Sequence, residues 1–127
     1  MAERKLRMMI VDDEMGILKI LKEVFELRGW ETITTPTGLT VMATLEKEPI
    51  DIMLLDIKLP NGSGMEVLKS VKGKYPKLPV IMFTGFGYED NLVNEAMRLG
   101  ASGYVSKSVP IQELIEVVNN TLIKHQE

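Results

Sequence analysis

Acidic residues stand directly behind apolar runs at two places in this sequence. Asp12, Asp13 and Glu14 follow "LRMMIV", and Asp56 follows "DIMLL". Carboxylates brought within about 4–5 Å of one another repel, at a cost on the order of 3–4 kcal/mol per pair at an effective dielectric near 20. Proton uptake or a bound cation relieves that repulsion. Taken alone, each group also fits an ordinary turn or helix cap.

Two further polar residues stand behind apolar runs later in the chain. Thr84 follows "PVIMF" and precedes a glycine, and Lys107 follows "SGYVS". A threonine before glycine is common in turns and a lysine is usually solvated, so neither residue is diagnostic alone. Together with the acids they make an oxygen-rich set with one amine, which suits phosphoryl transfer beside a metal. Oxygen ligands without nearby His or Cys favour Mg²⁺ or Mn²⁺.

The elements that carry these residues alternate between two periodicities. Short apolar or β-branched runs predict strands, and i, i+3, i+4, i+7 spacing predicts helices. The predicted strands are 6–11, 31–35, 51–55, 79–83 and 102–106. The predicted helices run from Ile17 to a stop at Gly29, near 38–48, near 64–74, near 89–99, and from Ile111, after Pro110, to Leu122.

Strands separated by helices require right-handed crossovers and a parallel sheet. Five such units are too few for a closed eight-fold barrel. We therefore predict an α/β fold: an open, doubly wound sheet of five parallel strands in the order 2-1-3-4-5. No linker or repeat interrupts the chain, so a single domain is expected to fill residues 1–127.

The predicted topology brings the polar residues together. Ligands bind such sheets outside the carboxyl ends of the strands. The first and third strands are neighbours in this order, so Asp12, Asp13 and Asp56 should converge. Thr84 and Lys107 would then lie at the next two strand ends. Four strand ends that all carry such residues are much harder to explain as turns than any one of them.

The composition argues against several classes of protein. A net charge of −3 without a block of Lys or Arg gives no sign of direct nucleic-acid binding. No apolar run approaches the ~18–20 residues of a membrane span, and the apolar stretch near the N-terminus is too short for a signal peptide. The absence of cysteine rules out disulfides and thiolate metal sites, which fits a cytoplasmic protein.

Four segments, in order, resemble the receiver domain of two-component response regulators, and the resemblance covers nearly the whole chain. They are "IVDDE", "LLDIKLPNGSGMEVL", "VIMFTG" and "AMRLGASGYVSK". The resemblance implies a flavodoxin-like (βα)5 fold and a signalling phosphoprotein that catalyses only its own phosphorylation and dephosphorylation. A sensor histidine kinase or phosphotransfer protein would donate the phosphoryl group to Asp56, the phosphoacceptor.

The resemblance also implies a set of metal ligands around Asp56. Asp13 is expected to bind Mg²⁺ directly, and Asp12 is expected to act mainly through water. Asp56 itself and the backbone carbonyl of Lys58 would complete the share of the coordination that the protein supplies.

Phosphorylation is expected to change a distant surface. Lys107 would pair with one phosphate oxygen and Thr84 with another, and both are expected to lack these partners otherwise. Tyr104 occupies the aromatic switch position of the family and would pack inward when Thr84 moves, although ordinary strand packing explains a tyrosine there equally well. The readout surface, residues 89–125, would contact an output domain or target protein. The sequence leaves open a homodimer through the same surface.

The chain departs from the family pattern after Lys107. The family usually has Lys-Pro with a cis bond where this chain has "KSVP". We expect Lys107 still to reach the site, because its four-carbon stem tolerates modest backbone shifts. Lys58 and Phe86 flank the mouth through which a hydrolytic water would approach. The bulk of Phe86 is expected to shield the aspartyl phosphate.

Three alternatives share parts of this pattern. A phosphatase of the haloacid-dehalogenase type would need a second Asp where Lys58 stands. A flavodoxin-like cofactor binder would need a Ser/Thr/Gly-rich phosphate loop in place of the acids at 12–14. A receiver-like interaction module that is never phosphorylated would not need the intact site residues, and an assay is required to exclude it.

Overall fold

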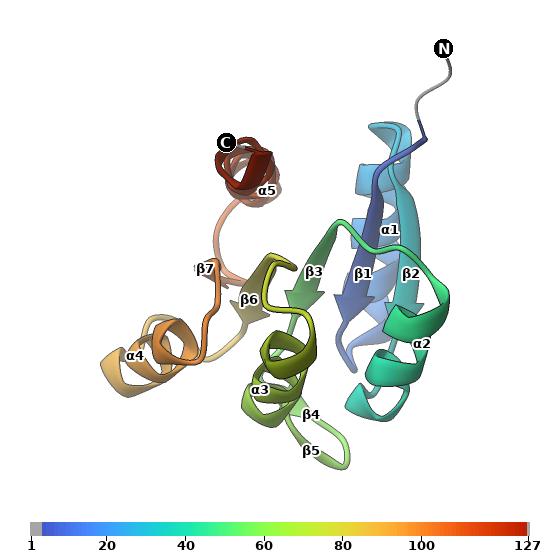
Figure 1. Ribbon diagram of the computed structural model, residues 1–127. Helices are drawn as coiled ribbons and strands as arrows, with labels where there is room; N and C mark the ends of the chain where they lie inside the picture. The colour runs from blue at the N-terminus through green and yellow to red at the C-terminus, as the bar shows by residue number, and fades with distance from the viewer. Residues whose placement is uncertain (1–3, 127) are drawn as a thin grey trace.

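A five-stranded parallel sheet forms the centre of the computed structural model, which describes residues 4–126 (Figure 1). Its strands are β1 (Arg7–Val11), β2 (Glu31–Thr35), β3 (Ile52–Leu55), β6 (Val80–Thr84) and β7 (Gly103–Ser106). They lie in the order β2-β1-β3-β6-β7. Counted along the chain this order is 2-1-3-4-5, so the predicted fold class is confirmed.

Helices cover both faces of the sheet, as a doubly wound fold requires. α1 (Met15–Leu27) and α5 (Ile111–Gln126) lie on one face, and α2 (Val41–Lys47), α3 (Gly64–Lys74) and α4 (Asp90–Arg98) lie on the other (Figure 1). The predicted helix 38–48 is divided: η1 (Gly38–Thr40), a 3-10 turn capped by the Thr37 side chain, precedes α2. The other four predicted helices are confirmed, with ends that differ by a few residues.

The central strands are buried on both faces. On β1, Met8 and Ile10 pack towards α1 and α5, while Met9 and Val11 pack towards α2, α3 and α4. All four of these residues are at most 1% exposed. Burial on both sides explains why these strands read as continuous apolar runs instead of alternating ones. Each strand therefore leaves the core abruptly at its carboxyl end, where the polar residues begin.

A short antiparallel hairpin follows β3 and was not predicted. It consists of β4 (Lys58–Leu59) and β5 (Gly62–Ser63). Asn61 and Gly62 turn the chain with positive φ angles of 66° and 144°, a conformation that Gly and Asn tolerate best. Strands of two residues are too short for a periodic pattern, so the sequence signal there was only that of a turn.

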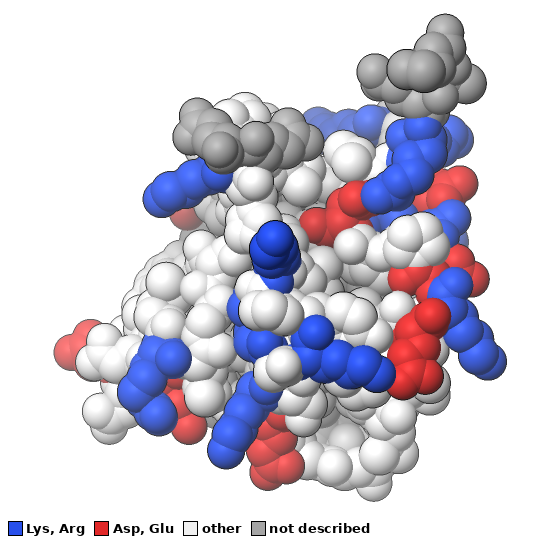
Figure 2. Space-filling model, viewed as in Figure 1, with Lys and Arg blue, Asp and Glu red and all other residues white. Residues whose placement is uncertain are grey.

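Ion pairs cross the amino-terminal end of the sheet. Arg7 on β1 pairs with Glu31 at 2.5 Å and with Glu48 at 2.8 Å. Figure 2 shows basic and acidic side chains side by side on the side of the molecule where β2 lies in Figure 1. Within residues 4–126, every helix is too short or too polar to cross a lipid bilayer.

Candidate functional site

The carboxyl ends of the strands carry the predicted site residues. Asp12 directly follows β1 and Asp56 directly follows β3, which is its neighbour in the sheet. The Asp56 N–H donates to the Val11 carbonyl at 2.9 Å, so the two aspartates begin side by side. Thr84 ends β6 and Lys107 follows β7, further along the same edge.

Asp12, Asp13 and Asp56 converge, as the topology predicted. Each offers one carboxylate oxygen, and these oxygens all lie within 4.8 Å of one another. Asp12 and Asp56 are buried, whereas Asp13 is exposed. The cluster consists of hard oxygen donors alone, two of them shielded from solvent, which matches the ligand preference of Mg²⁺ or Mn²⁺. These residues are suited to hold a divalent cation.

The Lys107 ammonium lies among the carboxylates. Its Nζ is 2.8 Å from Asp12 Oδ2, 2.8 Å from Asp56 Oδ2 and 2.5 Å from Glu14 Oε1. The expectation that Lys107 reaches the site is confirmed. The expectation that it lacks partners before phosphorylation is wrong, because a lysine side chain only 10% exposed needs acceptors and the carboxylates at the strand ends supply them.

Burial and ion pairing act against each other in this cluster. Burial raises the pKa of Asp12, and the hydrogen bonds that it accepts from Lys107 and from the Glu14 N–H offset this only in part. Burial by itself lowers the pKa of Lys107, but hydrogen bonds to Asp12, Asp56 and Glu14 outweigh it, so the pKa is raised. The ammonium therefore stays charged at neutral pH, with several carboxylates around it.

An open pocket of about 300 Å³ leads from solvent to Asp56. Thr84, which lines it, is fully buried, and its Oγ1 accepts the Phe86 N–H at 3.3 Å, which leaves the hydroxyl proton for another acceptor. Phe86 itself is 45% exposed, as expected of a residue at the mouth of the site. The lining residues are Asp13, Glu14, Asp56, Lys58, Thr84, Gly85, Phe86 and Lys107.

Gly64, which the sequence analysis did not single out, lies against the backbone of Asp56. A Cβ at Gly64 would stand 1.9 Å from the Asp56 carbonyl oxygen, and the Gly64 N–H donates to the Ile57 carbonyl at 2.6 Å. α3 therefore begins in direct contact with the segment that carries Asp56, and only glycine permits that approach. The signal available in the sequence was "NGSG", in which two glycines follow Asp56 closely.

The segment "KSVP" orients Lys107 without a cis peptide bond. All peptide bonds between residues 4 and 126 are trans, including the bond between Lys107 and Ser108. The hydroxyls of Ser106 and Ser108 lie 2.7 Å apart and hydrogen-bond on either side of Lys107. The Lys107 N–H donates to the Thr84 carbonyl at 2.8 Å. The strand end that bears Lys107 is thus held by its own neighbours.

Tyr104 lies on β7 with its hydroxyl buried. That hydroxyl has no hydrogen-bond partner among the described residues, and burial raises the pKa of Tyr104. Its ring centroid is 5.9 Å from that of Tyr88, in the loop after Thr84. The switch role of Tyr104 stays a prediction, as does the metal-ligand role of the Lys58 carbonyl, although Lys58 lines the pocket.

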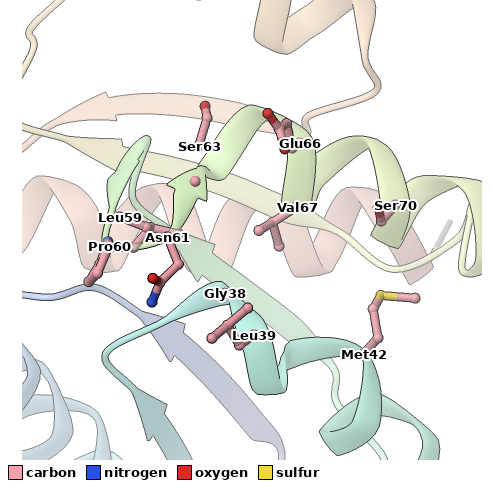
Figure 3. A pocket seen from close by; sticks show the side chains of 11 residues that line it. Gly38, Leu39, Met42, Leu59, Pro60, Asn61, Ser63, Glu66, Val67 and Ser70 are labelled. Atoms are coloured by element: carbon pink, nitrogen blue, oxygen red, sulfur yellow. The ribbon is translucent and has the colours of Figure 1, made fainter.

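A second hollow lies between η1, the β4–β5 hairpin and α3 (Figure 3). Glu66 is the single ionisable residue among the described residues that line it. With one carboxylate and no ammonium among these lining residues, this hollow offers no chemistry comparable with that around Asp56. Its other lining residues are Gly38, Leu39, Met42, Leu59, Pro60, Asn61, Gly62, Ser63, Val67 and Ser70.

Comparison with known sequences gives matches that span the whole site. The family described as "Response regulator receiver domain" matches residues 8–119. Sporulation initiation phosphotransferase F of Bacillus subtilis is 35% identical over 116 residues, which are 91% of this chain and 93% of that protein. Response regulator SaeR of Staphylococcus aureus is 35% identical over 117 residues, which are 92% of this chain and 50% of SaeR. The chain thus spans about half the length of SaeR.

Solved structures of similar proteins have the same fold. A receiver domain protein described as CheY-like, from Methanospirillum hungatei, superimposes with a TM-score of 0.92 at 30% identity, covering 97% of this chain and 98% of that chain. A receiver domain from Clostridium thermocellum gives a TM-score of 0.85 at 32% identity, covering 95% and 97%.

Proposed function

Because this chain belongs to the response regulator receiver domain family, we propose that Asp56 accepts a phosphoryl group from a sensor histidine kinase or a phosphotransfer protein. One observation carries the proposal. The Asp56 carboxylate lies 2.8 Å from the Lys107 ammonium and within 4.8 Å of oxygens from Asp12 and Asp13, at an open pocket. A buried carboxylate with an ammonium and further acids around it is the arrangement that an aspartyl phosphate requires.

The transfer is a displacement at phosphorus. A carboxylate oxygen of Asp56 attacks, the bond between phosphorus and the imidazole nitrogen of the donor breaks, and that nitrogen keeps the electron pair and takes up a proton. The Asp56 carboxylate is oriented by two contacts: Oδ1 accepts the Ile57 N–H at 2.7 Å and Oδ2 accepts Lys107 Nζ at 2.8 Å. Both contacts hold the nucleophile in place before the donor arrives.

Mg²⁺, or Mn²⁺, would neutralise the charge that develops on the phosphoryl oxygens. Asp13, which is exposed, would bind the ion directly, and the buried Asp12 would act mainly through water. Asp56 and the Lys58 carbonyl would supply the remaining protein oxygens. The support for this assignment is the convergence of the three aspartates and the excess of negative charge around a single ammonium.

After the transfer, Lys107 and Thr84 would hold the phosphoryl oxygens. For Lys107 this means an exchange of partners, because its ammonium already contacts three carboxylates. The Thr84 hydroxyl would donate a hydrogen bond to a phosphoryl oxygen, which would draw the loop after β6 inward. Two or three charge-assisted hydrogen bonds can supply the ~3–5 kcal/mol needed to shift a two-state equilibrium from mostly inactive to mostly active.

The changed loop would be read on the surface of residues 89–125, formed by α4, β7 and α5. Tyr104 would serve as the switch residue, since it lies on β7 within this surface and its ring is 5.9 Å from that of Tyr88, in the loop after Thr84. An output domain or a target protein would bind this surface, and a second copy of the chain is an alternative partner there.

Intact-mass measurement tests the chemistry directly. The protein is incubated with acetyl phosphate and Mg²⁺, and the mass of one phosphoryl group is expected on the parent and on Asp90→Asn, a change at an exposed acid of α4. No adduct is expected on Asp56→Asn or in the presence of EDTA. An unmodified parent would favour the interaction module that is never phosphorylated, and an adduct on Asp56→Asn would reject the assignment of Asp56.

A further inference from the structure

Tyr88 bridges the two segments that end in Thr84 and Lys107. Its phenolic oxygen accepts the backbone N–H of Ser106 at 3.2 Å, across 18 residues of sequence. Its ring stands 5.9 Å from that of Tyr104. Tyr88 is not among the residues that line the pocket at Asp56, so any effect on the site must pass through what it holds.

The Ser106 N–H faces the open edge of the sheet. β7 is an edge strand, paired with β6 alone among the described strands. Successive N–H groups along a strand point to opposite sides. The next N–H, that of Lys107, donates to the Thr84 carbonyl on β6 at 2.8 Å. The Ser106 N–H therefore points away from β6, where the Tyr88 hydroxyl satisfies a donor that would otherwise depend on water.

These contacts form a closed ring of hydrogen bonds and backbone that joins the Thr84 loop to the strand end that bears Lys107. The Thr84 carbonyl accepts the Lys107 N–H on one side of the ring. On the other side the chain turns at Gly87, whose φ is 70°, and Tyr88 reaches back to Ser106. Because this ring of contacts joins the two segments at two points, the segments should move together. Its weakest contact is the hydrogen bond made by the Tyr88 side chain.

We propose that Tyr88 is a positioning residue for Lys107: by holding the Ser106 N–H, its hydroxyl fixes the strand end from which the ammonium reaches Asp56. Ser106 is 4% exposed while Tyr88 is 55% exposed. The hydroxyl can therefore be removed at the surface without disturbing the core. Its removal takes away the hydrogen bond of a buried backbone group, the Ser106 N–H. The expected effect on the rate of phosphorylation rests on the proposed function, whereas the structural link from Tyr88 through Ser106 to Lys107 does not.

The structural link is tested in the unphosphorylated protein. Tyr88→Phe removes the hydroxyl that accepts the Ser106 N–H and keeps the aromatic ring. The amide of Ser106 should exchange with solvent about fivefold faster, the factor that corresponds to one hydrogen bond of ordinary strength, and the NMR signal of the Lys107 side chain should shift. Tyr75→Phe, at a partly buried tyrosine after α3, should change neither signal. Unchanged Ser106 exchange and Lys107 signals in Tyr88→Phe would overturn the inference.

A double-mutant cycle tests the consequence for chemistry. Tyr88→Phe should slow adduct formation from acetyl phosphate and Mg²⁺ about fivefold when Lys107 is present. It should have no further effect in a Lys107→Ala background, because the effect passes through Lys107. Equal slowing in both backgrounds would overturn the inference. A parent that takes up no phosphoryl group would refute the proposed function instead, and the Ser106 and Lys107 signals would then decide on Tyr88.

Discussion

The Lys107 ammonium lies 2.8 Å from Oδ2 of Asp56, although the two residues are 51 positions apart. It also lies 2.8 Å from Asp12, and neither aspartate side chain is more than 6% exposed. Lys107 is therefore already paired with the proposed phosphoacceptor in the unphosphorylated protein. On the proposed function, the free energy that Lys107 can contribute to switching is the difference between the strength of its phosphoryl interaction and that of its carboxylate interactions. This difference is smaller than the full strength of the phosphoryl interaction.

Lys107→Ala should slow formation of the aspartyl phosphate by about tenfold or more, because a hydrogen bond to a charged group is worth about 1.5–3 kcal/mol. The rate is measured as adduct formation from acetyl phosphate and Mg²⁺. Lys22→Ala is the matched control, since the Lys22 ammonium pairs with Glu26 on the surface, and it should leave the rate unchanged. Equal rates for the parent and Lys107→Ala would contradict the role assigned to Lys107.

Asp12→Asn should change how stability depends on pH. Burial raises the pKa of Asp12 above 3.8 in the folded protein, so just above that pH the folded state keeps a proton that the unfolded state has released. The stabilising contribution of Asp12 is therefore complete below pH 3.8 and is lost as the pH rises through its folded pKa. Urea unfolding in EDTA gives the free energy of unfolding of the parent and of Asp12→Asn. The value for the parent minus the value for Asp12→Asn should decrease as the pH rises through this window. A difference that increases with pH would contradict the assignment.

Mg²⁺ should stabilise the parent against unfolding, because an ion that binds only the folded state adds about 1.4 kcal/mol at tenfold its Kd. Asp13→Asn should remove most of this gain while leaving the metal-free stability nearly unchanged, since Asp13 is exposed. Glu66→Gln, in the separate hollow of Figure 3, is the control and should keep the full gain. Urea titrations with and without Mg²⁺ provide the measurement, and a full response in Asp13→Asn would argue against Asp13 as a ligand.

Gly64→Ala and Gly73→Ala, both in α3, should act in opposite directions. The Cβ at Gly64 would stand 1.9 Å from the Asp56 carbonyl oxygen, whereas nothing lies within 4 Å of a Cβ at Gly73. Gly64→Ala should lower the free energy of unfolding by about 1–3 kcal/mol or more and slow phosphorylation of the displaced Asp56. Gly73→Ala, in the last turn of α3, should raise stability by about 0.4–1 kcal/mol, because alanine reduces the conformational entropy of the unfolded chain. Similar effects at both positions would contradict the close approach at Gly64.

Phe86→Ala should speed hydrolysis of the aspartyl phosphate severalfold. Phe86 lines the pocket at Asp56 and is 45% exposed, so its removal opens a path for water. Leu39→Ala removes another exposed apolar side chain, away from this pocket, and should leave the lifetime unchanged. Decay of the purified phosphoprotein is followed by intact mass, and a lifetime that is equal or longer in Phe86→Ala would refute shielding.

The positions of the strands and helices could be predicted because apolar runs and helical periodicity are local properties of the chain, and the strand order then followed from the usual topology of a doubly wound sheet. Strands such as Ile52–Leu55 read as unbroken apolar runs since both faces are covered. Residues directly behind such runs must lie at the carboxyl edge of a parallel sheet. Asp12, Asp56, Thr84 and Lys107 could therefore be assigned to one site, and the convergence of the acids is confirmed. The hairpin after β3 was missed because strands of two residues carry no periodic signal.

The partners of individual side chains were decided only by the tertiary structure. Lys107 contacts Glu14 across 93 residues, and Tyr88 holds the Ser106 amide across 18. The contact of Gly64 with the backbone of Asp56 depends on how closely α3 approaches the end of β3. Composition and periodicity determine which residues share an edge of the sheet. Which atoms meet there depends on the packing of segments that are distant in sequence, because hydrogen bonds and steric contacts are set by distances of a few tenths of an ångström.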